Sequence, residues 1–575
     1  MGPVIVRRQS GASEQALGED LEPLLRRIYA ARNVRSRREL ETGFQQLQPM
    51  DRLGGLDEAV TLLETALRER QRVLVVGDFD ADGATSSALV VRGLRALGAA
   101  DVRYLVPNRF EYGYGLTPEI VTVAAAQRPQ LIMTVDNGVS SIEGVAAARA
   151  RGIRVLVTDH HLAGDRLPAA DAIVNPNLAG DTFPSKHLAG VGVAFYVLLA
   201  LRARLRADGW FEQAGGREPN LAELLDLVAL GTVADVVPLD HNNRILVHQG
   251  LCRIRAGRCV PGIAALLELA GRDRGRITAA DLGFVVGPRL NAAGRLEDMS
   301  LGIECLLADD PGRAREMAAR LDQLNRERRT IEAEMQAQAL EELERLHLDG
   351  DGLPTGLCLF DERWHQGVIG ILASRIKERL HRPVIAFAQA AEGELKGSAR
   401  SVPGLHIRDA LDAVAARHPT LIDRFGGHAM AAGLSLPRAH LESFQAAFDE
   451  VVRERVDEDA LRGVIYSDGE LASTDFSLDT AERLRNAGPW GQGFPEPLFD
   501  GLFEVRSRRV VGERHLKLAV VPEGGEPVLD AIAFNQADDE YGAVGARVRL
   551  VYRLDVNEFR GTRTVQLVVE HIAGR

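Results

Sequence analysis

The 575-residue sequence lacks long apolar runs and contains few cysteines. No apolar stretch is long enough to cross a bilayer, and the first residues lack the apolar core of a secretory signal. We therefore expect a cytoplasmic protein without a membrane partner. No cysteine stands in a C-x-x-C pair, which argues against a zinc knuckle and a dithiol redox site, so we expect buried, reduced thiols. The four cysteines are Cys252, Cys259, Cys305 and Cys358.

An excess of positive charge is also missing. The formal net charge is −12, which argues against a protein that binds nucleic acid over its whole surface. A local basic channel is compatible with this total, because the distribution of charge matters more than its sum. The apolar fraction of 46% and the charged fraction of 26% are ordinary for a globular protein. The length suffices for about three to four domains.

Four short segments that carry carboxylates and histidines are the most informative feature of the chain. Three of them follow short apolar runs that end at Gly77, Val135 and Thr158, and we predict that these runs are buried parallel strands. The fourth follows a helical or buried segment. Ligands collect at the carboxyl ends of parallel strands, so these side chains should share one crevice. The candidate metal ligands are Asp78, Asp80, Asp82, Asp136, His160 and Asp235.

The residue types of these segments favour a metal centre. Clustered carboxylates repel one another unless cations neutralise them, and oxygen ligands together with a histidine suit Mn(II) or Mg(II). The first segment also matches the opening of a calcium-binding EF-hand, but Leu89 stands where that loop needs a glutamate. The alternatives for single segments are a solvated acidic turn and, for Asp235, a helix cap. Their recurrence after similar apolar runs makes these alternatives the weaker interpretation.

The remaining pattern predicts a succession of domains. A helical, Arg-rich extension over residues 1–50 precedes alternating strands and helices over residues 51–305. A helix without internal Gly or Pro after its first turn then connects, over residues 306–350, to a second α/β unit over residues 351–462. Period-two alternation over residues 463–575 predicts a small barrel or sandwich.

The second α/β unit carries candidate phosphate contacts. Glycines such as Gly426 and Gly427 let backbone N–H groups approach a phosphate closely, although a tight packing turn would use glycine as well. Arginine binds phosphate in a bidentate manner, which favours Arg400. The candidate substrate-binding residues of this unit are Ser398, Arg400, Ser401, Gly426, Gly427 and His428.

The C-terminal β-region contains a basic stretch that indicates either a nucleic-acid-binding surface or a solvated strand face. Trp490 and Phe494 could stack on bases, but we expect them to pack between domains. The basic residues are Arg506, Arg508, Arg509, Arg514 and Lys517.

The four acidic segments resemble, in order, the four motifs of the DHH phosphoesterase superfamily. They are Asp78–Gly83, Asp136-Asn137-Gly138, Asp159-His160-His161 and Ala234-Asp235. The stretch from Gly426 to Gly433 resembles the glycine-rich signature of the DHH-associated domain. The domain order is similar to that of single-strand-specific exonucleases within this superfamily. The resemblance implies an α/β fold with a parallel-sheet DHH domain, a long connecting helix, a second α/β DHH-associated domain and a C-terminal OB-like β-barrel.

The resemblance also implies roles for individual residues. Asp80 and Asp136 would bind one metal ion, and Asp136 would bridge to a second ion. Asp82, His160 and Asp235 would complete the second ion's ligands, whereas Asp78 is either a ligand or a partner of one. Asp159 and His161 would be the catalytic pair, with Asp159 orienting its neighbours and His161 facing the scissile phosphate. The candidates for a 5′-phosphate pocket are Arg109, Arg289 and Arg400.

From this resemblance we expect an exonuclease that uses two Mn(II) or Mg(II) ions and digests single-stranded DNA from the 5′ end, in DNA repair and recombination. The expected partners are single-stranded DNA, a single-strand binding protein and a helicase, and the expected state is a monomer. The alternative is a DHH phosphodiesterase that acts on short oligoribonucleotides or cyclic dinucleotides. A scaffold without activity is a weaker alternative, because the chain retains every metal position.

Overall fold

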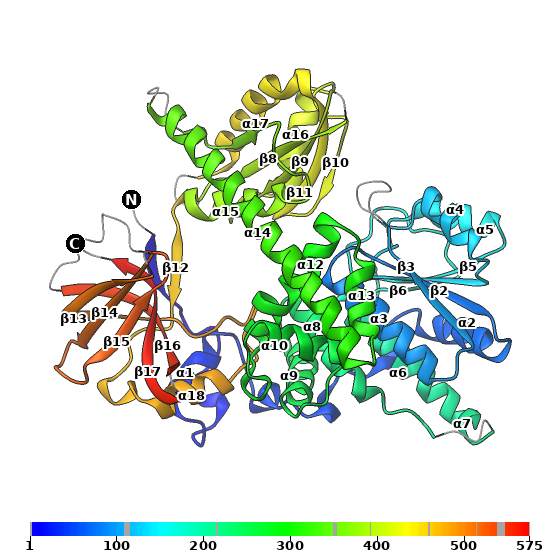
Figure 1. Ribbon diagram of the computed structural model, residues 1–575, viewed down its shortest axis with the longest axis horizontal. Coiled ribbons are helices and arrows are strands. Elements are labelled where there is room, and N and C mark those ends of the chain that lie inside the picture. Colours follow the sequence, from blue (N-terminus) through cyan, green and yellow to red (C-terminus); the bar gives the residue numbers. More distant parts are fainter. Residues whose placement is uncertain are drawn as a thin grey trace. The chain divides into compact units, whose positions relative to one another are not determined.

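A computed structural model describes residues 3–107, 115–213, 217–348, 353–391, 393–457, 461–512, 514–536, 547–559 and 561–573. The contacts divide the chain into two units. One comprises Met1–Val6 and Leu324–Tyr466, and the other comprises Arg7–Gln323 and Ser467–Arg575. In the described part of the chain, no helix is both apolar enough and long enough to span a bilayer. Figure 1 labels the elements of both units.

The larger unit contains a five-stranded parallel sheet of order β3-β2-β4-β5-β6. Its central strands are buried along nearly their whole length, because helices cover both faces. Helices α4 and α5 pack on one face through residues such as Ile120 and Val145. The strands are β2 (Arg72–Gly77), β3 (Asp101–Leu105), β4 (Leu131–Val135), β5 (Arg154–Thr158) and β6 (Ala172–Val174), and the helices of this layer are α2 (Leu56–Arg68), α3 (Ala81–Ala96), α4 (Pro118–Ala126), α5 (Ile142–Ala150) and α6 (Gly190–Ala207).

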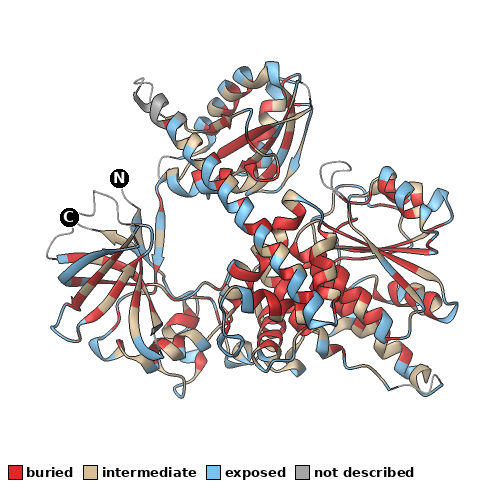
Figure 2. Ribbon diagram, in the orientation of Figure 1, coloured by how far each residue is buried: buried red, intermediate tan, exposed pale blue. Residues whose placement is uncertain are grey.

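A group of mainly buried helices follows the sheet in sequence, and Figure 2 shows buried residues along them. Helix α8 is buried over eight consecutive residues, from Leu225 to Thr232, which is why its sequence shows no amphipathic period. The helices are α7 (Trp210–Gln213), α8 (Leu225–Ala234), α9 (His241–Arg255), α10 (Pro261–Leu269), α11 (Ala279–Asp281), the π-helical turn η7 (Leu282–Val286), α12 (Gly287–Leu296), α13 (Ser300–Leu307) and the long α14 (Pro311–Leu348).

The same unit contains a closed five-stranded barrel of order β13-β14-β15-β17-β16, in which β15 and β17 are parallel. This strand order is that of an OB-fold. The barrel strands are β13 (Phe499–Val511), β14 (His515–Pro522), β15 (Leu529–Ala533), β16 (Arg547–Phe559) and β17 (Thr562–Ala573), and α18 (Leu478–Asn486) precedes them.

The N-terminal segment is less helical than expected. Its described residues contain strand β1 (Val4–Arg7), one α-helix, α1 (Pro23–Ala30), and four 3-10 helices, η1 (Glu14–Leu17), η2 (Arg37–Leu40), η3 (Phe44–Gln46) and η4 (Met50–Arg52). Leu24 and Ile28 of α1 belong to the hydrophobic core of the barrel. Arg32 forms a buried ion pair with Asp468 at 2.8 Å. The segment therefore packs on the C-terminal domain, a long-range contact that its local sequence does not encode.

The smaller unit contains a five-stranded sheet of order β10-β11-β9-β8-β7, in which only the pair β7–β8 is parallel among the described strands. Helices α16 and α17 pack on one face through apolar residues such as Leu411 and Phe448. Its elements are β7 (Leu357–Phe360), α15 (Ile369–Leu380), β8 (Val384–Ala391), β9 (Glu394–Arg400), α16 (Ile407–Arg417), β10 (Arg424–Gly427), β11 (Ala431–Pro437), α17 (Leu441–Arg455) and β12 (Val464–Ser467).

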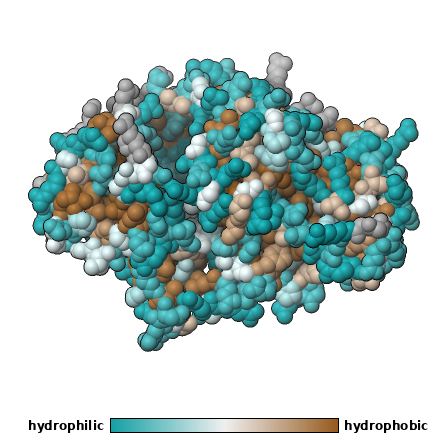
Figure 3. All heavy atoms as spheres, turned by 60° about the horizontal axis from the view of Figure 1, so that its bottom comes forward, coloured by the Kyte–Doolittle hydropathy of each residue, from teal (hydrophilic) through white to brown (hydrophobic). Residues whose placement is uncertain are grey.

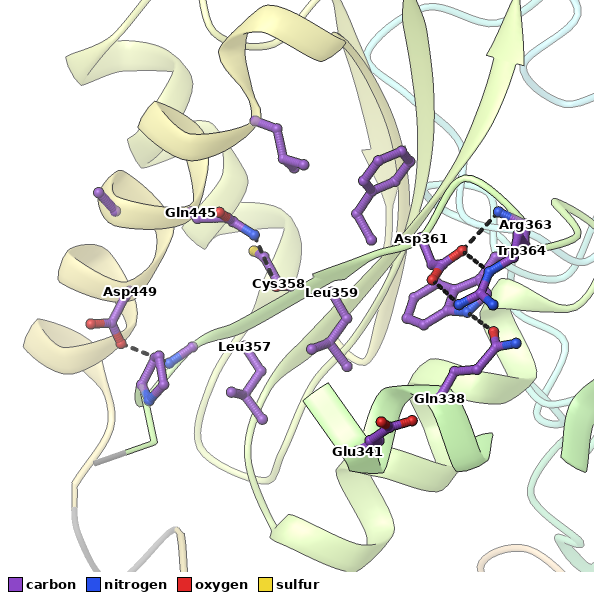
Figure 4. Close-up of a pocket in the computed structure, with 15 residues that line it drawn as sticks. Gln338, Glu341, Leu357, Cys358, Leu359, Asp361, Arg363, Trp364, Gln445 and Asp449 are labelled. Atoms are coloured by element: carbon purple, nitrogen blue, oxygen red, sulfur yellow. Dashed lines mark hydrogen bonds and ion pairs between the residues drawn. The ribbon is translucent and has the colours of Figure 1, made fainter. Parts of the chain in front are cut away.

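A cavity of about 520 Å³ lies along edge strand β7, between residues of α14 and α17. Figure 4 shows two contacts that close its walls: Trp364 donates to Gln338 at 3.0 Å, and Gln445 donates to the carbonyl of Cys358 at 3.1 Å. None of the candidate site residues that the structure describes lines this cavity. Its volume is therefore a poor guide to where the chemistry takes place.

Candidate metal centre

The acidic segments lie where the parallel sheet brings its strand ends together. Asp78 follows β2, Asp136 follows β4 and Asp159 follows β5, and β2, β4 and β5 are neighbours in the sheet. Asp80 caps α3 by accepting a hydrogen bond from Gly83 N at 2.9 Å. Asp235 ends helix α8. The prediction that these strand ends share one crevice is thus confirmed.

The side chains of these segments form three overlapping groups with ligand atoms within 4.8 Å of one another. His160 Nε2 lies 3.1 Å from Asp136 Oδ1 and 3.5 Å from Asp235 Oδ2. Asp136 belongs to two of the groups, which is what a bridging ligand requires. The groups are Asp136, His160 and His161; Asp82, His160 and Asp235; and Asp78, Asp80 and Asp136.

The electrostatics of the cluster call for cations. Burial and the charge of Asp235 raise the pKa of Asp82 to about 7. Burial and Asp80 raise the pKa of Asp235 to about 7, and burial together with four neighbouring carboxylates raises the pKa of Asp136 well above its ordinary value. Oxygen Oδ2 of Asp235 is buried and accepts no hydrogen bond from the described residues. This donor set, in which carboxylates outnumber imidazoles, fits divalent cations such as Mn²⁺ or Mg²⁺.

Two glycines bring helices close enough to complete the centre. A Cβ atom on Gly190 would lie 2.6 Å from the Cβ of Asp136, and one on Gly231 would lie 2.2 Å from the Thr85 hydroxyl and 2.8 Å from Asp82. The backbone N–H groups of Gly190 and Val191, at the start of α6, donate to Asp82 at 2.6 and 3.0 Å. Neither Gly190, Val191 nor Gly231 was among the residues predicted from the sequence. A glycine at the first turn of an apolar helix was the available signal.

Asp159 fixes the conformation of the histidine loop. Its Oδ1 accepts hydrogen bonds from His160 N at 2.7 Å, His161 N at 3.1 Å and His161 Nδ1 at 2.8 Å. Its Oδ2 accepts one from Val139 N at 2.8 Å. Burial alone would lower the pKa of His161, but the hydrogen bond and charge of Asp159 outweigh it and raise the pKa to about 9. Burial and the neighbouring His161 lower the pKa of His160, which keeps it neutral, as a metal ligand requires.

Asparagines hold the same loop from behind. Asn175 donates to the carbonyl of His161 at 2.9 Å, and Asn177 donates to the carbonyl of His160 at 2.5 Å. Such partners orient the ligands of a metal site. Neither asparagine was predicted from the sequence, although both follow strand β6.

The candidate arginines are distributed over both units. Arg109 lies outside the described residues. Arg289 is in the larger unit, where it pairs with Asp322 at 2.9 Å and donates to Val285 O at 2.7 Å. Arg400 is in the smaller unit and donates to Ser398 Oγ at 3.1 Å and to Ser374 Oγ at 3.2 Å. Burial lowers the pKa of Arg400, so this cation lies in a place that favours an anionic ligand.

The other candidate substrate-binding residues of the smaller unit differ from one another in their contacts and in their exposure. The buried Ser401 hydroxyl donates to Leu405 O at 2.7 Å, so it is engaged within the fold. Ser398 of β9 pairs with Gly433 of β11, and Gly433 pairs with Gly426 of β10. These three residues therefore lie side by side in one row across the sheet. His428 follows at the end of β10 and is exposed.

The two glycines of β10 are unlike each other. A Cβ atom on Gly426 would meet nothing within 4 Å, whereas one on Gly427 would lie 2.4 Å from Ala431 O, with φ at +145°. Gly427 is therefore required by the fold. Gly426 leaves bare backbone on an open face, as a close approach by a ligand would need. The next row on this face carries two exposed basic residues that the sequence analysis missed, Lys396 and Arg424.

Most of the candidate basic residues of the barrel are exposed, but Lys517 is half-buried. Arg508 and Arg509 are exposed on β13, whereas Arg506 pairs with Glu504 at 3.1 Å and Lys517 with Asp530 at 2.8 Å. Arg514 lies in the turn before β14. Figure 3 shows hydrophobic atoms on the visible surface of the barrel, at the left of the view. The exposed large apolar residues of the barrel strands and their ends are Leu502, Val510, Val511, Val528 and Phe534.

Trp490 and Phe494 stack on each other with ring centroids 5.1 Å apart. Tyr29 of the N-terminal segment lies 6.1 Å from Trp490, and the guanidinium of Arg244 lies 4.3 Å above Phe494. The prediction that these two aromatic residues pack between domains is confirmed.

Three family descriptions match the chain. Residues 72–232 match the DHH family, N-terminal domain, residues 354–454 match the DHHA1 domain, and residues 467–571 match the RecJ OB domain. Together they correspond to the sheet that carries the acidic segments, the smaller unit and the barrel.

Several known proteins are similar along the whole chain. The single-stranded-DNA-specific exonuclease RecJ of Dickeya dadantii is 59% identical over 573 residues, which cover 100% of both chains. The protein of the same description from Escherichia coli is 57% identical over 568 residues, 99% of this chain and 98% of that one. The crystal structure of RecJ from Thermus thermophilus in complex with Mn²⁺ superposes with a TM-score of 0.81 at 31% identity, covering 100% of this chain and 79% of that one. The corresponding complex with Mg²⁺ gives 0.75 at 30% identity, with 100% and 78% covered.

Proposed function

The chain belongs to the RecJ family of single-stranded-DNA-specific exonucleases, and we propose that it uses two divalent metal ions to hydrolyse single-stranded DNA from the 5′ end. The observation that carries this proposal is the cluster around Asp136, whose carboxylate belongs to two ligand groups at once. The match to relatives extends through the barrel, which disfavours the alternative of a shorter phosphodiesterase that acts on cyclic dinucleotides.

The residues that would hold the ions are Asp78, Asp80, Asp82, Asp136, His160 and Asp235. A bound pair of such ions lowers the pKa of a coordinated water and neutralises charge on the reacting phosphate. The relatives' structures contain Mn²⁺ or Mg²⁺, and the imidazole of His160 favours Mn²⁺ of the two.

The chain's own residues would prepare the phosphate for attack. Asp159 accepts a hydrogen bond from Nδ1 of His161, and this contact raises the pKa of the imidazole and so favours its protonated form. The ring's other nitrogen, Nε2, can then donate a hydrogen bond to a phosphate oxygen, which stabilises the charge that develops during hydrolysis. Asp159 itself would not contact the substrate; it is a positioning residue for His160 and His161.

The proposal also specifies that digestion starts at the 5′ end of the strand. Its support is Arg400, a half-buried cation that donates to Ser398 beside the open backbone of Gly426 and Gly433, which suits a terminal phosphate. Arg289 is a second candidate, although its ion pair with Asp322 already engages it. The third candidate for the 5′-phosphate pocket, Arg109, is supported by the sequence alone.

The setting of the activity is also part of this proposal. The relatives are bacterial proteins named for an action on single-stranded DNA, which supports work in the cytoplasm during DNA repair and recombination. A single-strand binding protein and a helicase are the partners that would supply such strands, and we propose that the enzyme acts as a monomer.

One set of assays tests the activity and its polarity. The purified full-length chain is given 5′-labelled and 3′-labelled single strands and blunt duplexes, with Mn²⁺, with Mg²⁺ or with EDTA. We expect metal-dependent release of label from the 5′ end of single strands, and Arg400→Gln should lose the preference for a 5′-phosphate over a 5′-hydroxyl. Equal digestion from both ends, or of blunt duplex, would refute the proposed polarity and strand choice.

A further inference from the structure

Two exposed apolar side chains flank the turn of α8 that supplies Asp235. Val236 follows Asp235 directly and is 63% exposed, and Phe284 of the π-helical turn η7 is 78% exposed. Neither takes part in the metal cluster. Single exposed apolar residues are common on protein surfaces, so exposure by itself does not indicate a ligand here.

Two glycines allow turn η7 to pack closely against the last turn of α8. A Cβ atom on Gly283 would lie 3.1 Å from Val233 Cγ1, and one on Gly287 would lie 3.1 Å from the Cβ of Ala234. Leu282, Val285 and Val286 of η7 are buried. A π-turn inserts an extra residue into a helix and recurs at functional sites, and here the residue that remains outside is Phe284. Its ring is therefore carried by a turn that packs against the turn of α8 ending in a metal ligand.

The backbone of Val236 is strained. Its φ is +63°, a conformation that is an outlier for a β-branched residue and that glycine would adopt without cost. Packing does little to offset this strain, because most of the side chain is exposed. Strained residues of this kind cluster where the fold serves a ligand. The branched side chain is thus placed beside Asp235 at a cost in stability.

We propose that Phe284 and Val236 form a nucleobase platform, which holds a base of the strand whose backbone enters the metal centre. The inference rests on the proposed function, because it takes the substrate to be a single strand. The metal centre would contact the phosphates of the strand. The unpaired bases are the apolar surface of the strand that remains for other contacts. Aromatic side chains stack on bases of any sequence, since every base has a π-face. Two isolated side chains are too small a patch for a protein or membrane partner.

The test uses a phosphorothioate-protected single strand with Mn²⁺, so that binding is measured without digestion. The probe base 2-aminopurine, whose fluorescence changes on stacking, is moved along the strand one position at a time. With the wild-type chain we expect a fluorescence change at one position near the 5′ end. Phe284→Ala should abolish that change and weaken binding about 5- to 150-fold, whereas Phe284→Trp should retain both.

An abasic site separates stacking from a structural role. Placed at the responsive position, it should weaken wild-type binding by the same factor and leave Phe284→Ala with no further loss. Val236→Gly should weaken binding of the normal strand without lowering the unfolding temperature, because it relieves the backbone strain. Val123→Ala, which removes an exposed apolar side chain from α4, is the matched control and should bind as wild type does.

Two results would overturn the platform. The first is that Phe284→Ala binds the normal strand as tightly as wild type does. The second is that this variant loses equal affinity for normal and abasic strands and has a lowered unfolding temperature. A wild-type chain that binds no single strand at all would instead refute the proposed function on which the platform rests. The wild-type binding curve therefore distinguishes the two failures.

Discussion

Nε2 of His160 lies 3.1 Å from Oδ1 of Asp136, although the two residues are 24 positions apart in the sequence. The contact joins the ends of neighbouring strands β4 and β5. It places an imidazole with a lowered pKa next to a carboxylate with a raised pKa. A neutral imidazole beside crowded carboxylates is an arrangement that a divalent cation would complete.

Replacement of Asp136 should separate activity from stability. Asp136→Asn removes a carboxylate that belongs to two ligand groups, so turnover should fall by at least about 100-fold. The metal-free variant should unfold at a temperature no lower than wild type, because a buried charge among like charges is removed. Nuclease assays and thermal unfolding with EDTA check both parts. Near-normal activity with metal still bound would rule out a bridging role.

The metal-free protein should lose stability as the pH rises. The folded-state pKa values of Asp82 and Asp235 are about 7, whereas an unfolded aspartate titrates near 3.9. Between these values the folded state holds more protons, so the free energy of unfolding contributed by the centre decreases from about pH 4 to pH 7. With EDTA, the unfolding temperature should therefore be lower at about pH 7.5 than at about pH 5.5, and Mn²⁺ should raise it more at the higher pH.

Asp82→Asn is the control for this pH dependence, because other groups also titrate over the range. The variant should show a flatter pH dependence of the unfolding temperature with EDTA and a smaller shift with Mn²⁺. A pH profile identical to wild type would show that the carboxylates of the centre do not titrate as described.

Asp159 and His161 should give different losses. Asp159→Asn keeps the volume but weakens the set of contacts that orients His160 and His161, so metal affinity should fall by about 10- to 100-fold. His161→Gln should slow turnover while metal affinity changes little. Calorimetric titration with Mn²⁺ and kcat measurement distinguish the two roles. An unchanged metal affinity in Asp159→Asn would contradict its positioning role.

The exposed arginines of β13 should contribute to binding through phosphates. Arg508→Gln combined with Arg509→Gln should weaken binding of a long single strand and reduce the slope of log affinity against log salt by about 1 for each phosphate that is no longer neutralised. A short oligonucleotide should be cleaved at a normal rate. Arg506→Gln is the matched control, because Arg506 is paired with Glu504. Equal effects of all three changes would favour a solvated strand face without a binding role.

Replacement by alanine should have different effects at the two neighbouring glycines of β10. Gly427→Ala should destabilise the protein, since its Cβ would lie 2.4 Å from Ala431 O at a φ of +145°. Gly426→Ala should leave the unfolding temperature unchanged or slightly raised, but should weaken substrate binding because the Cβ covers backbone that a phosphate would approach. Thermal unfolding and strand binding are measured on both variants. Stable, fully binding Gly426→Ala would remove this residue from the substrate site.

The sequence by itself indicated three buried parallel strands and the shared crevice at their ends where the candidate ligands meet. Apolar runs such as Val73–Val76 show that a strand is buried on both faces, and chain alternation implies parallel neighbours. Since parallel strands end at one edge, Asp78, Asp136 and Asp159 had to converge. The strand periodicity of the barrel and the long helix α14 were readable for the same reason, because period and length are local properties.

Only the tertiary structure decided which distant residues touch. Gly190 approaches Asp136 because α6 packs across the strand ends, and Arg32 pairs with Asp468 across 436 positions of sequence. The tertiary structure also decided that Arg289 pairs with Asp322 and that Phe284 is exposed on a π-turn. It made Gly427 necessary for the fold, whereas it left the backbone of Gly426 open. Such relationships depend on the packing of whole elements against one another, which no local period or spacing encodes.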